Sequence, residues 1–246
     1  MIIEIKKQVI TKNQIKYIRG LSLKKNRIKD QCFVVEGEKS VTELLKSSFQ
    51  IKDLYATKQW ISENNSAKVN EVSIGELNRI SNLKSANNVL AVVSFSEVKK
   101  VVTEGVVLVL DDVNDPGNLG TIVRMCDWFS VQQIVCSENT VDIYNPKVVQ
   151  STMGSLFRVS IMYTDLPKYL ADISTPIYGA FMEGENIKGI SAFKNTHLVM
   201  GNEANGISKE VEKYISKKVA IKNIGENTES LNVAVATAIL LHEFCN

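Results

Sequence analysis

The side chains best suited to chemistry lie in three polar loops, each of which follows an apolar run in the sequence. The first loop, residues 114–120, contains a proline and a glycine that favour a tight turn. Asn118 falls near the predicted start of a helix, where its carboxamide could cap backbone amides. Arg124 lies further along that helix and could reach an anion. Taken alone, the loop is more typical of a capped strand-to-helix turn with a surface arginine.

The second loop, residues 201–207, holds Glu203 between glycines and asparagines, which tolerate left-handed backbone and expose amides. It has no GxGxxG or Walker pattern, and a glutamate suits a hydroxyl or a cationic group better than a phosphate. The third loop, residues 222–232, contains Ser230, a predicted helix N-cap, and Asn232, predicted in the first turn. The chemistry available here is positioning by Asn, Arg, Glu and Ser.

The sequence shows no other set of residues in a spacing typical of catalysis or metal binding. The two histidines, His197 and His242, fall inside a predicted strand and at the end of an apolar helix, where structural roles are expected. The four cysteines show no metal-ligand spacing, and we expect buried or partly buried reduced thiols rather than a zinc site or disulfides. They are Cys32, Cys126, Cys136 and Cys245.

Strands that alternate with helices must position these loops, and the alternation predicts an α/β fold. Strands are predicted at residues 32–35, 51–56, 69–72, 89–95, 106–110, 134–135, 159–162, 177–181, 197–200 and 219–221. Helices are predicted after Thr11 and at residues 37–46, 74–80, 119–129, 146–153, 166–170, 209–214 and 231–244. The continuous apolar run at 106–110 is typical of a strand buried on both faces of a parallel sheet. A doubly wound sheet binds ligands at the carboxyl ends of its strands.

Charge divides the 246-residue chain into two parts. Residues 1–100 carry 18 Lys/Arg and 10 Asp/Glu, a net of +8, whereas residues 101–246 carry 11 and 17, a net of −6. A basic part suggests a polyanionic partner, although a solvated lysine-rich face is the simpler explanation of charge alone. We predict a domain at residues 1–95, a linker at 96–104 and a second domain at 105–246. The N-terminus lacks a secretory signal and no apolar run spans a membrane, so we expect a cytoplasmic protein.

The last predicted helix is apolar nearly all round between residues 233 and 241. Such a helix is buried inside the domain or against another subunit, and we favour a homodimer interface.

Together the three loops resemble the SpoU (TrmH-like) branch of the SPOUT class of RNA methyltransferases. The resemblance rests on Asp115-Pro116-Gly117-Asn118-Leu119-Gly120 with Arg124, on Leu198-Val199-Met200-Gly201-Asn202-Glu203 with Gly206, and on Ile221 followed by Ser230-Leu231-Asn232-Val233-Ala234. The first part, with Phe33-Val34-Val35-Glu36-Gly37, resembles the family's substrate-binding domain of ribosomal-protein type. The resemblance implies a trefoil knot near the C-terminus, a homodimer and S-adenosylmethionine-dependent methyl transfer to a ribose 2′-hydroxyl of RNA, with ribosomal RNA favoured over transfer RNA.

The resemblance also implies the site residues. It assigns the active site to Asn118, Arg124, Glu203, Ser230 and Asn232. It assigns cofactor binding to Gly179, Ala180, Phe181, Gly201, Ile221 and Leu231, with no metal. Because a guanidinium stays charged at ordinary pH, we expect Arg124 to clamp a phosphate rather than to act as a base.

Three residues depart from the family's usual pattern: Lys222 and Asn223 follow Ile221 where a proline and a methionine-like residue are usual, and Ala234 replaces a common serine. Two other functions stay open. One is an RNA-binding protein of the same fold without turnover. The other is a dinucleotide-dependent enzyme, which the missing glycine fingerprint after Leu110 disfavours.

Overall fold

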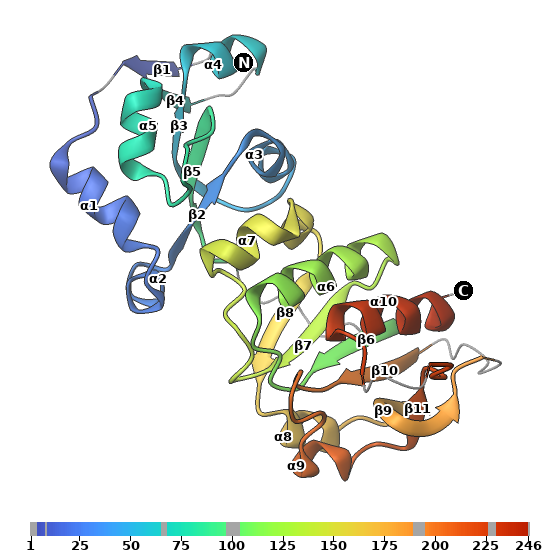
Figure 1. Cartoon of the computed structure of the whole chain (residues 1–246). Coiled ribbons are helices and arrows are strands. Elements are labelled where there is room, and N and C mark those ends of the chain that lie inside the picture. Colours follow the sequence, from blue (N-terminus) through green and yellow to red (C-terminus); the bar gives the residue numbers. More distant parts are fainter. Residues whose placement is uncertain are drawn as a thin grey trace. The chain divides into compact units, whose positions relative to one another are not determined.

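The computed structural model describes residues 4–7, 9–64, 68–96, 104–188, 195–225 and 230–245 (Figure 1). The chain forms two compact units. Unit 1 comprises Met1–Glu97 and Tyr144–Phe157, and unit 2 comprises Val98–Ile143 and Arg158–Asn246. Most of the predicted linker, residues 97–103, and residues 226–229 of the third loop lie outside the described part.

Unit 1 is built on a five-stranded sheet in the order β1-β4-β3-β5-β2. Its strands are β1 (Glu4–Lys7), β2 (Cys32–Glu36), β3 (Ile51–Ala56), β4 (Lys68–Glu71) and β5 (Val89–Ser94). Its helices are α1 (Lys12–Gly20), α2 (Lys24–Asp30), α3 (Glu38–Leu45), α4 (Lys58–Glu63), α5 (Ile74–Ile80) and α7 (Pro146–Thr152), with a 3-10 turn at Ser155–Phe157. The pairs β1–β4 and β4–β3 are parallel, whereas β3–β5 and β5–β2 are antiparallel.

The predicted capping of α1 by Thr11 is confirmed, and the Gln14 side chain completes a capping box. Three short elements were not predicted, namely β1, α2 and α4. Each is four to seven residues long and offers too few apolar positions to show a period, such as Trp60 and Ile61 in α4.

The segment 144–157 packs within unit 1, although the sequence-based division assigned it to the second domain. The Tyr144 ring lies 4.4 Å from the ring of Phe33 and 4.1 Å from that of Phe95. The Phe157 ring lies 5.2 Å from that of Phe49. This segment connects two neighbouring strands of the other unit's sheet, so its position in the sequence gives no sign that its aromatic side chains complete the core of unit 1.

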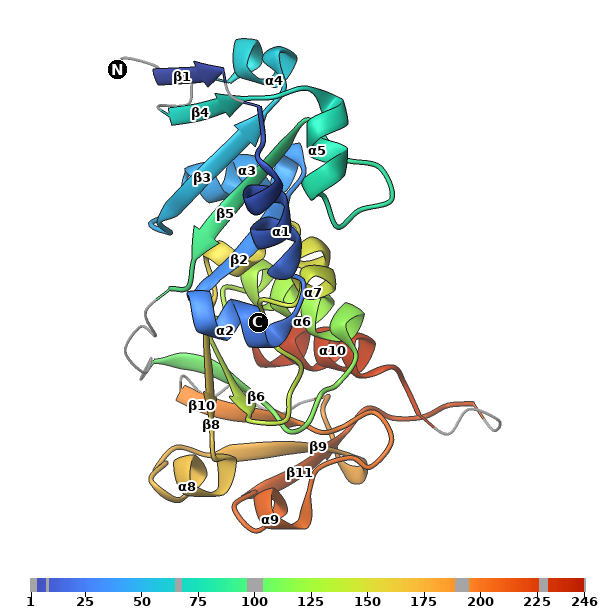
Figure 2. The same ribbon diagram turned by 90° about the vertical axis from the view of Figure 1, so that its left-hand side faces the viewer.

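Unit 2 is built on a six-stranded sheet in the order β11-β9-β10-β6-β7-β8, and all of its described strand pairs are parallel (Figures 1 and 2). Its strands are β6 (Gly105–Leu110), β7 (Gln133–Ser137), β8 (Ser160–Thr164), β9 (Ile177–Asn186), β10 (Asn195–Met200) and β11 (Lys217–Ala220). Its helices are α6 (Pro116–Trp128), α8 (Leu166–Ala171), α9 (Lys209–Glu212) and α10 (Val233–Phe244). This confirms the predicted α/β fold with a parallel sheet, while the trefoil knot stays a prediction.

Strand β6 lies at the centre of this sheet, between β7 and β10, and its last four residues are buried. From β6 the chain proceeds through β7 to β8 on one side, and then returns to form β9, β10 and β11 on the other. The strand order therefore reverses at β6, which makes the carboxyl ends of β6 and β10 the expected ligand position. No helix in the described part of the chain is both long enough and apolar enough to span a membrane.

Candidate active site

Two of the three predicted loops begin side by side, at the carboxyl ends of neighbouring strands in the unit 2 sheet. Leu110, the last residue of β6, pairs with Met200, the last residue of β10, and the Asp111 amide donates to the Met200 carbonyl over 2.9 Å. The loops that start at residues 111 and 201 therefore leave the sheet from adjacent points. Asn202 strengthens this contact because its Nδ2 donates to the Asp112 carbonyl over 2.7 Å.

The helices that follow the first and third loops are capped by other residues than those predicted. Asp115 caps α6, with its Oδ1 accepting from the Asn118 amide over 2.8 Å and Pro116 in the first turn. Asn232, rather than Ser230, caps α10, and its Oδ1 accepts from the Ala234 amide over 2.9 Å. Because Asp115 performs the capping, the carboxamide of Asn118 is released for contacts with the other loops.

Asn118 joins all three loops. Its Nδ2 donates to Oε1 of Glu203 over 2.9 Å, and its Oδ1 accepts from Nδ2 of Asn232 over 2.9 Å. Glu203 also accepts from the backbone amides of Asn114 and Asp115, each over 3.3 Å. Three of the five predicted active-site residues thus form one hydrogen-bonded chain, which we call the Asn–Glu network (Asn118, Glu203 and Asn232).

The Asn–Glu network favours the ionised form of Glu203. Partial burial of the carboxyl group acts to raise its pKa, but the hydrogen bonds from Asn118 and from the backbone amides outweigh it. The pKa of Glu203 therefore lies below its usual value. At neutral pH the side chain is an anion whose oxygens are already engaged as acceptors.

The second loop is a tight hairpin in which Gly201 has no room for a side chain. The amides and carbonyls of Asn202 and Gly206 are hydrogen-bonded reciprocally over 2.9 Å. A Cβ atom on Gly201 would lie 2.2 Å from the Gly206 carbonyl carbon and 2.3 Å from the Ile207 nitrogen. Both neighbours are backbone atoms, so glycine is required for this close approach.

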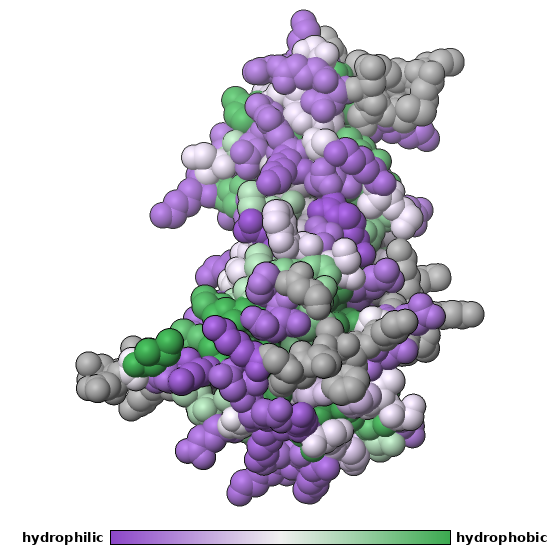
Figure 3. Space-filling model, turned by 90° about the vertical axis from the view of Figure 1, so that its right-hand side faces the viewer, coloured by the Kyte–Doolittle hydropathy of each residue, from purple (hydrophilic) through white to green (hydrophobic). Residues whose placement is uncertain are grey.

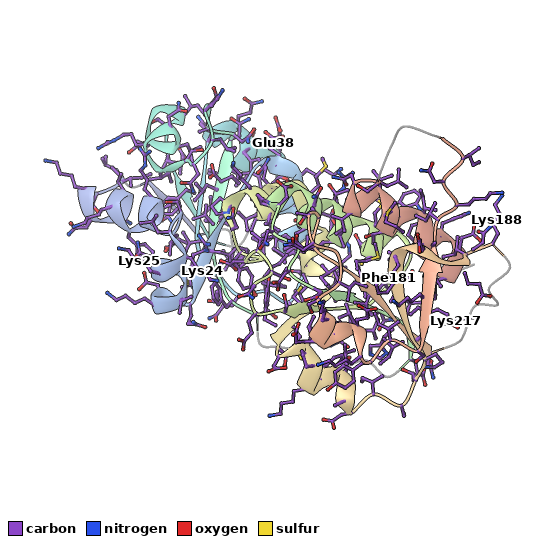
Figure 4. The ribbon with its side chains drawn as sticks, turned by 60° about the horizontal axis from the view of Figure 1, so that its bottom comes forward. Lys24, Lys25, Glu38, Phe181, Lys188 and Lys217 are labelled. Carbon is purple, nitrogen blue, oxygen red and sulfur yellow. The ribbon has the colours of Figure 1, made fainter. Side chains whose placement is uncertain are left out.

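A cavity of about 740 Å³ opens beside these loops, lined by residues from the middle of β9, from the ends of β10 and β11 and the loops that follow them, and from α10. Of the residues predicted to bind a cofactor, those that line the cavity are Ala180, Phe181, Gly201, Ile221 and Leu231. Glu203, Ser230 and Asn232 line it as well. Phe181, labelled in Figure 4, makes a cation–π contact with Lys218, whose Nζ lies 4.4 Å from the ring centroid.

Three predicted residues do not line this cavity: Asn118, which joins the network beside it, Gly179 and Arg124. Gly179 lies in β9, where a Cβ atom would come within 2.4 Å of Ile215 and 2.8 Å of Phe181, so it packs behind the wall. Arg124 lies exposed on α6 and forms no hydrogen bond or ion pair with the residues that the structure describes. Its guanidinium is therefore available to an external anion.

Asn202 and Asp111 are positioning residues that the sequence analysis missed. Asn202 tethers the second loop to the first, and the Asp111 carboxylate accepts from the Ser208 amide over 2.7 Å. Asparagine and aspartate are common in any loop, so neither residue type signals such a role. Only the adjacency of β6 and β10 in the sheet identifies them.

His197 has the structural role that was expected. Its ring nitrogens lie 2.9 Å from the Tyr169 hydroxyl and 3.0 Å from the Thr175 hydroxyl, and burial lowers its pKa to about 4. Cys32, Cys126 and Cys136 are buried free thiols, and Cys245 is half-buried. Within the described ranges, no group of His, Cys, Asp or Glu is arranged to hold a metal.

The parallel sheet, its reversal at β6 and the loop-built cavity define a ligand-binding α/β domain of the doubly wound class. A model of the SpoU rRNA methylase family matches residues 105–242, and a model of the MRM3-like substrate binding domain matches residues 12–91. The chain therefore belongs to the SpoU rRNA methylase family.

Individual relatives match nearly the whole chain. The 23S rRNA (guanosine(2553)-2′-O)-methyltransferase RlmP of Bacillus subtilis is 30% identical over 239 residues, 94% of this chain and 96% of RlmP. A TrmH-family structure from Porphyromonas gingivalis has a TM-score of 0.90 at 35% identity and covers 96% of this chain and 98% of its own. An AdoMet-bound rRNA methyltransferase from Sinorhizobium meliloti has a TM-score of 0.85 at 28% identity, and the match covers 98% of this chain and 97% of that protein.

The lowered pKa of Glu203 predicts a pH-dependent contribution to stability. Because the folded-state pKa lies below that of the unfolded chain, the ionised carboxylate stabilises the fold above a pH of about 4.5. This stabilisation is lost as the pH falls through the folded-state pKa. We expect Glu203→Gln to lower the free energy of unfolding at pH 7, because it removes the charge that the hydrogen bonds stabilise. The loss should be only about 1 kcal/mol, since solvent screens the largely exposed side chain. At pH 3.5 the loss should be smaller.

Urea unfolding followed by circular dichroism at the two pH values measures this difference. The matched control is Glu183→Gln, an exposed glutamate of β9 outside the network, which should change stability little at either pH. A Glu203→Gln effect of equal size at pH 7 and pH 3.5 would contradict the role given to the charge.

Proposed function

We propose that this protein transfers the methyl group of S-adenosylmethionine to a ribose 2′-hydroxyl of ribosomal RNA. The observation that carries the proposal is the Asn–Glu network beside a cavity of about 740 Å³, in a chain of the SpoU rRNA methylase family. The relative RlmP is named as a 2′-O-methyltransferase of a 23S rRNA guanosine, and its match extends over both units of this chain.

The cavity suits S-adenosylmethionine in size and lining. Small-molecule sites have volumes of about 300 to 1,000 Å³ and combine apolar walls with a few polar groups. Here Phe181, Ile221 and Leu231 supply apolar surface, while Asn202 and Ser230 supply polar groups. We assign cofactor binding to Ala180, Phe181, Gly201, Ile221 and Leu231, with Gly179 packed behind them. When bound, the cofactor supplies a methyl group already activated by its sulfonium.

The chain's own task is then to hold the ribose hydroxyl in line with that methyl group, a problem of positioning. We assign Glu203 to orientation rather than to proton removal, because its lowered pKa makes it a weak base. Asn118 is fixed at both ends of its carboxamide, by Glu203 and by Asn232. Asn118 and Ser230 are assigned to hold the nucleotide at the mouth of the cavity.

Arg124 is assigned to the phosphate next to the target ribose. A guanidinium offers paired N–H donors to a phosphate and keeps its charge at any ordinary pH. The exposed position of Arg124 on α6, the helix that carries Asn118, supports this assignment. The clamp would select a nucleotide over a free nucleoside and hold it against the network.

The two parts of the chain have separate tasks in this proposal. The basic first part, with a net charge of +8 over residues 1–100, binds the RNA, and the part from residue 105 onward carries out the methyl transfer. The match of residues 12–91 to a substrate-binding domain supports the first assignment. We place the reaction in the cytoplasm, where a bacterial-type ribosomal RNA substrate is found.

A homodimer through unit 2 accounts for the apolar surface of α6 and α10. Val235 and Ile239 lie one turn apart on α10 and are 49% and 37% exposed, and Trp128 at the end of α6 is 80% exposed. The Phe129 ring lies 6.2 Å from the His242 ring, so the ends of the two helices are neighbours. Figure 3 shows hydrophobic surface on the side where α10 lies in Figure 1. Contiguous exposed apolar surface often marks a site of protein–protein contact.

The proposed reaction is tested with purified protein, methyl-labelled S-adenosylmethionine, and unmodified ribosomal and transfer RNA in separate reactions. Digestion of the RNA to nucleosides should give label in a 2′-O-methylnucleoside from ribosomal RNA. Label from transfer RNA alone would change the substrate, and label on a base would contradict the ribose assignment. Cofactor binding with no transfer to either RNA would favour an RNA-binding protein without turnover.

Arg124→Ala is expected to lower kcat/KM for methyl transfer by at least about 100-fold, or about 2.7 kcal/mol of transition-state stabilisation. Cofactor affinity, measured by calorimetry, should be unchanged because Arg124 does not line the cavity. Arg124→Lys should recover only part of the activity, since a lysine makes no paired contact. The control Lys168→Ala removes an exposed cation of α8 in unit 2 and should have no such effect. Parental turnover in Arg124→Ala would place the site elsewhere.

The double variant Val235→Glu with Ile239→Glu is expected to convert a dimer into a monomer, because it places like charges in an apolar interface. Light scattering coupled to gel filtration measures the mass. Leu45→Glu, an exposed apolar residue of α3, is the control and should leave the dimer intact. The parent protein is measured at about 50 μM, a concentration at which an interface with a micromolar dissociation constant forms a dimer. A monomeric parent at this concentration would refute the proposal.

A further inference from the structure

The first two helices of unit 1 carry a concentration of positive charge that the fold does not use. Six basic side chains on these helices are exposed. They are Lys12, Lys16 and Arg19 of α1 and Lys24, Lys25 and Lys29 of α2, and together we call them the basic face. None of the six forms an ion pair or a side-chain hydrogen bond with the part of the chain that the structure describes.

The spacing of these residues makes the basic face continuous along each helix. Lys12, Lys16 and Arg19 follow the i, i+4, i+7 pattern of one helical face. The opposite side of α1 is buried through Ile18. In α2, Lys25 and Lys29 are four residues apart, whereas the buried Arg27 points the other way. Figures 1 and 2 show both helices along the same side of unit 1, and Figure 4 labels Lys24 and Lys25 on it.

The corner between the two helices is held by a buried arginine. Arg27 is 2% exposed, and its Nη1 donates to the carbonyls of Leu21 over 3.0 Å and Ser22 over 2.7 Å. Asn26 adds a bond from Nδ2 to the Gly20 carbonyl over 2.8 Å. These bonds satisfy the carbonyls at the end of α1, which would otherwise lack partners. The basic face is therefore presented on a fixed corner rather than on a loose turn.

The charge on this face opposes helix formation. Like charges at i, i+4, as in Lys12–Lys16 and Lys25–Lys29, destabilise a helix. Acidic groups nearby include Asp30 and Asp53, which act on Lys52 and Tyr17, and Glu76, which accepts from the Ile10 amide and caps α5. Of the six cations, only Arg19 and Lys29, each in the last turn of its helix, occupy a position that favours the helix. Three exposed side chains between them, Tyr17, Leu23 and Ile28, offer surface for bases or sugars.

We propose that the basic face is the surface on which unit 1 holds the phosphates of the RNA substrate. This inference rests on the proposed function and extends it to a particular surface. A row of cations that neutralises phosphates releases counterions, so binding through this face weakens steeply with salt. The face binds the RNA backbone and supplies affinity without reading sequence, whereas the nucleotide is selected at the Asn–Glu network.

The test neutralises one row of the face in the full-length protein. The variant Lys12→Gln, Lys16→Gln, Arg19→Gln removes three charges from α1. Binding of unmodified, in vitro transcribed 23S rRNA is measured by filter binding at several salt concentrations. Each phosphate contact contributes about 0.7 to 0.9 to the slope of log K against log salt, so the slope should fall by about 2 and the affinity by about 10- to 100-fold.

Two matched variants separate charge from other effects. Lys12→Arg, Lys16→Arg, Arg19→Lys keeps the charges and should bind as the parent does. Lys168→Gln, Lys209→Gln, Lys213→Gln removes three exposed charges from α8, α9 and the C-cap of α9 in unit 2, and should leave the slope unchanged. The neutral α1 variant should not have a lower melting temperature, because its substitutions are exposed and relieve the repulsion between Lys12 and Lys16. Its affinity for S-adenosylmethionine should be unchanged, because the cavity lies in unit 2.

The outcomes distinguish this inference from the proposed function. Methyl transfer by the parent to 23S rRNA tests the proposed function on its own. If the parent methylates this RNA and the neutral α1 variant binds it with parental affinity and salt slope, the basic face is not the RNA-binding surface. Equal losses in the neutral and the charge-preserving variants would also overturn the inference. A raised KM with an unchanged kcat in the neutral variant alone supports it.

Discussion

The pairing of β6 with β10 is the constraint on which the candidate site depends. Because Leu110 and Met200 are register partners, two loops that are 90 residues apart in sequence start from adjacent points. Asn202 and the Asp111 amide fix that adjacency, and only then can the Glu203 carboxylate meet the amides of Asn114 and Asp115. The Asn–Glu network adds the third loop through Asn232. The side chains of the network include no strong acid or base, and it is the topology of the sheet that gives them a defined geometry.

The elements of this fold could be predicted from sequence where the residue pattern is long or unbroken. The buried run of β6 and the capped α1 are examples, and both are observed. The caps of α6 and α10 were misplaced by a few residues because Asp115, Asn118, Ser230 and Asn232 are all chemically able to cap. Which residue caps and which reaches across to another loop depends on the distance between loops, and a local pattern contains no such information.

The segment 144–157 shows a second limit of sequence patterns. Its polar and apolar alternation fits a helix that connects β7 and β8, and that helix exists as α7. Its aromatic residues nevertheless complete a cluster with Phe33, Phe49 and Phe95 in unit 1. Consequently the chain passes between the units more than once, and removal of residues 1–95 would expose Tyr144 and Phe157. Separation of binding from catalysis is better achieved by surface substitutions than by truncation.

The distribution of charge follows from what the two parts would have to bind. RNA is a polyanion, whereas S-adenosylmethionine carries a sulfonium cation, so a uniformly charged protein would oppose one of them. Salt screens exposed charges over about 10 Å at 0.1 M, and each sign must therefore lie close to its own ligand. A basic part with a net charge of +8 and an acidic part with a net charge of −6 meet that requirement. Within the acidic part, Arg124 is an exposed cation on the helix that carries Asn118, and the proposed function gives it the phosphate beside the target ribose.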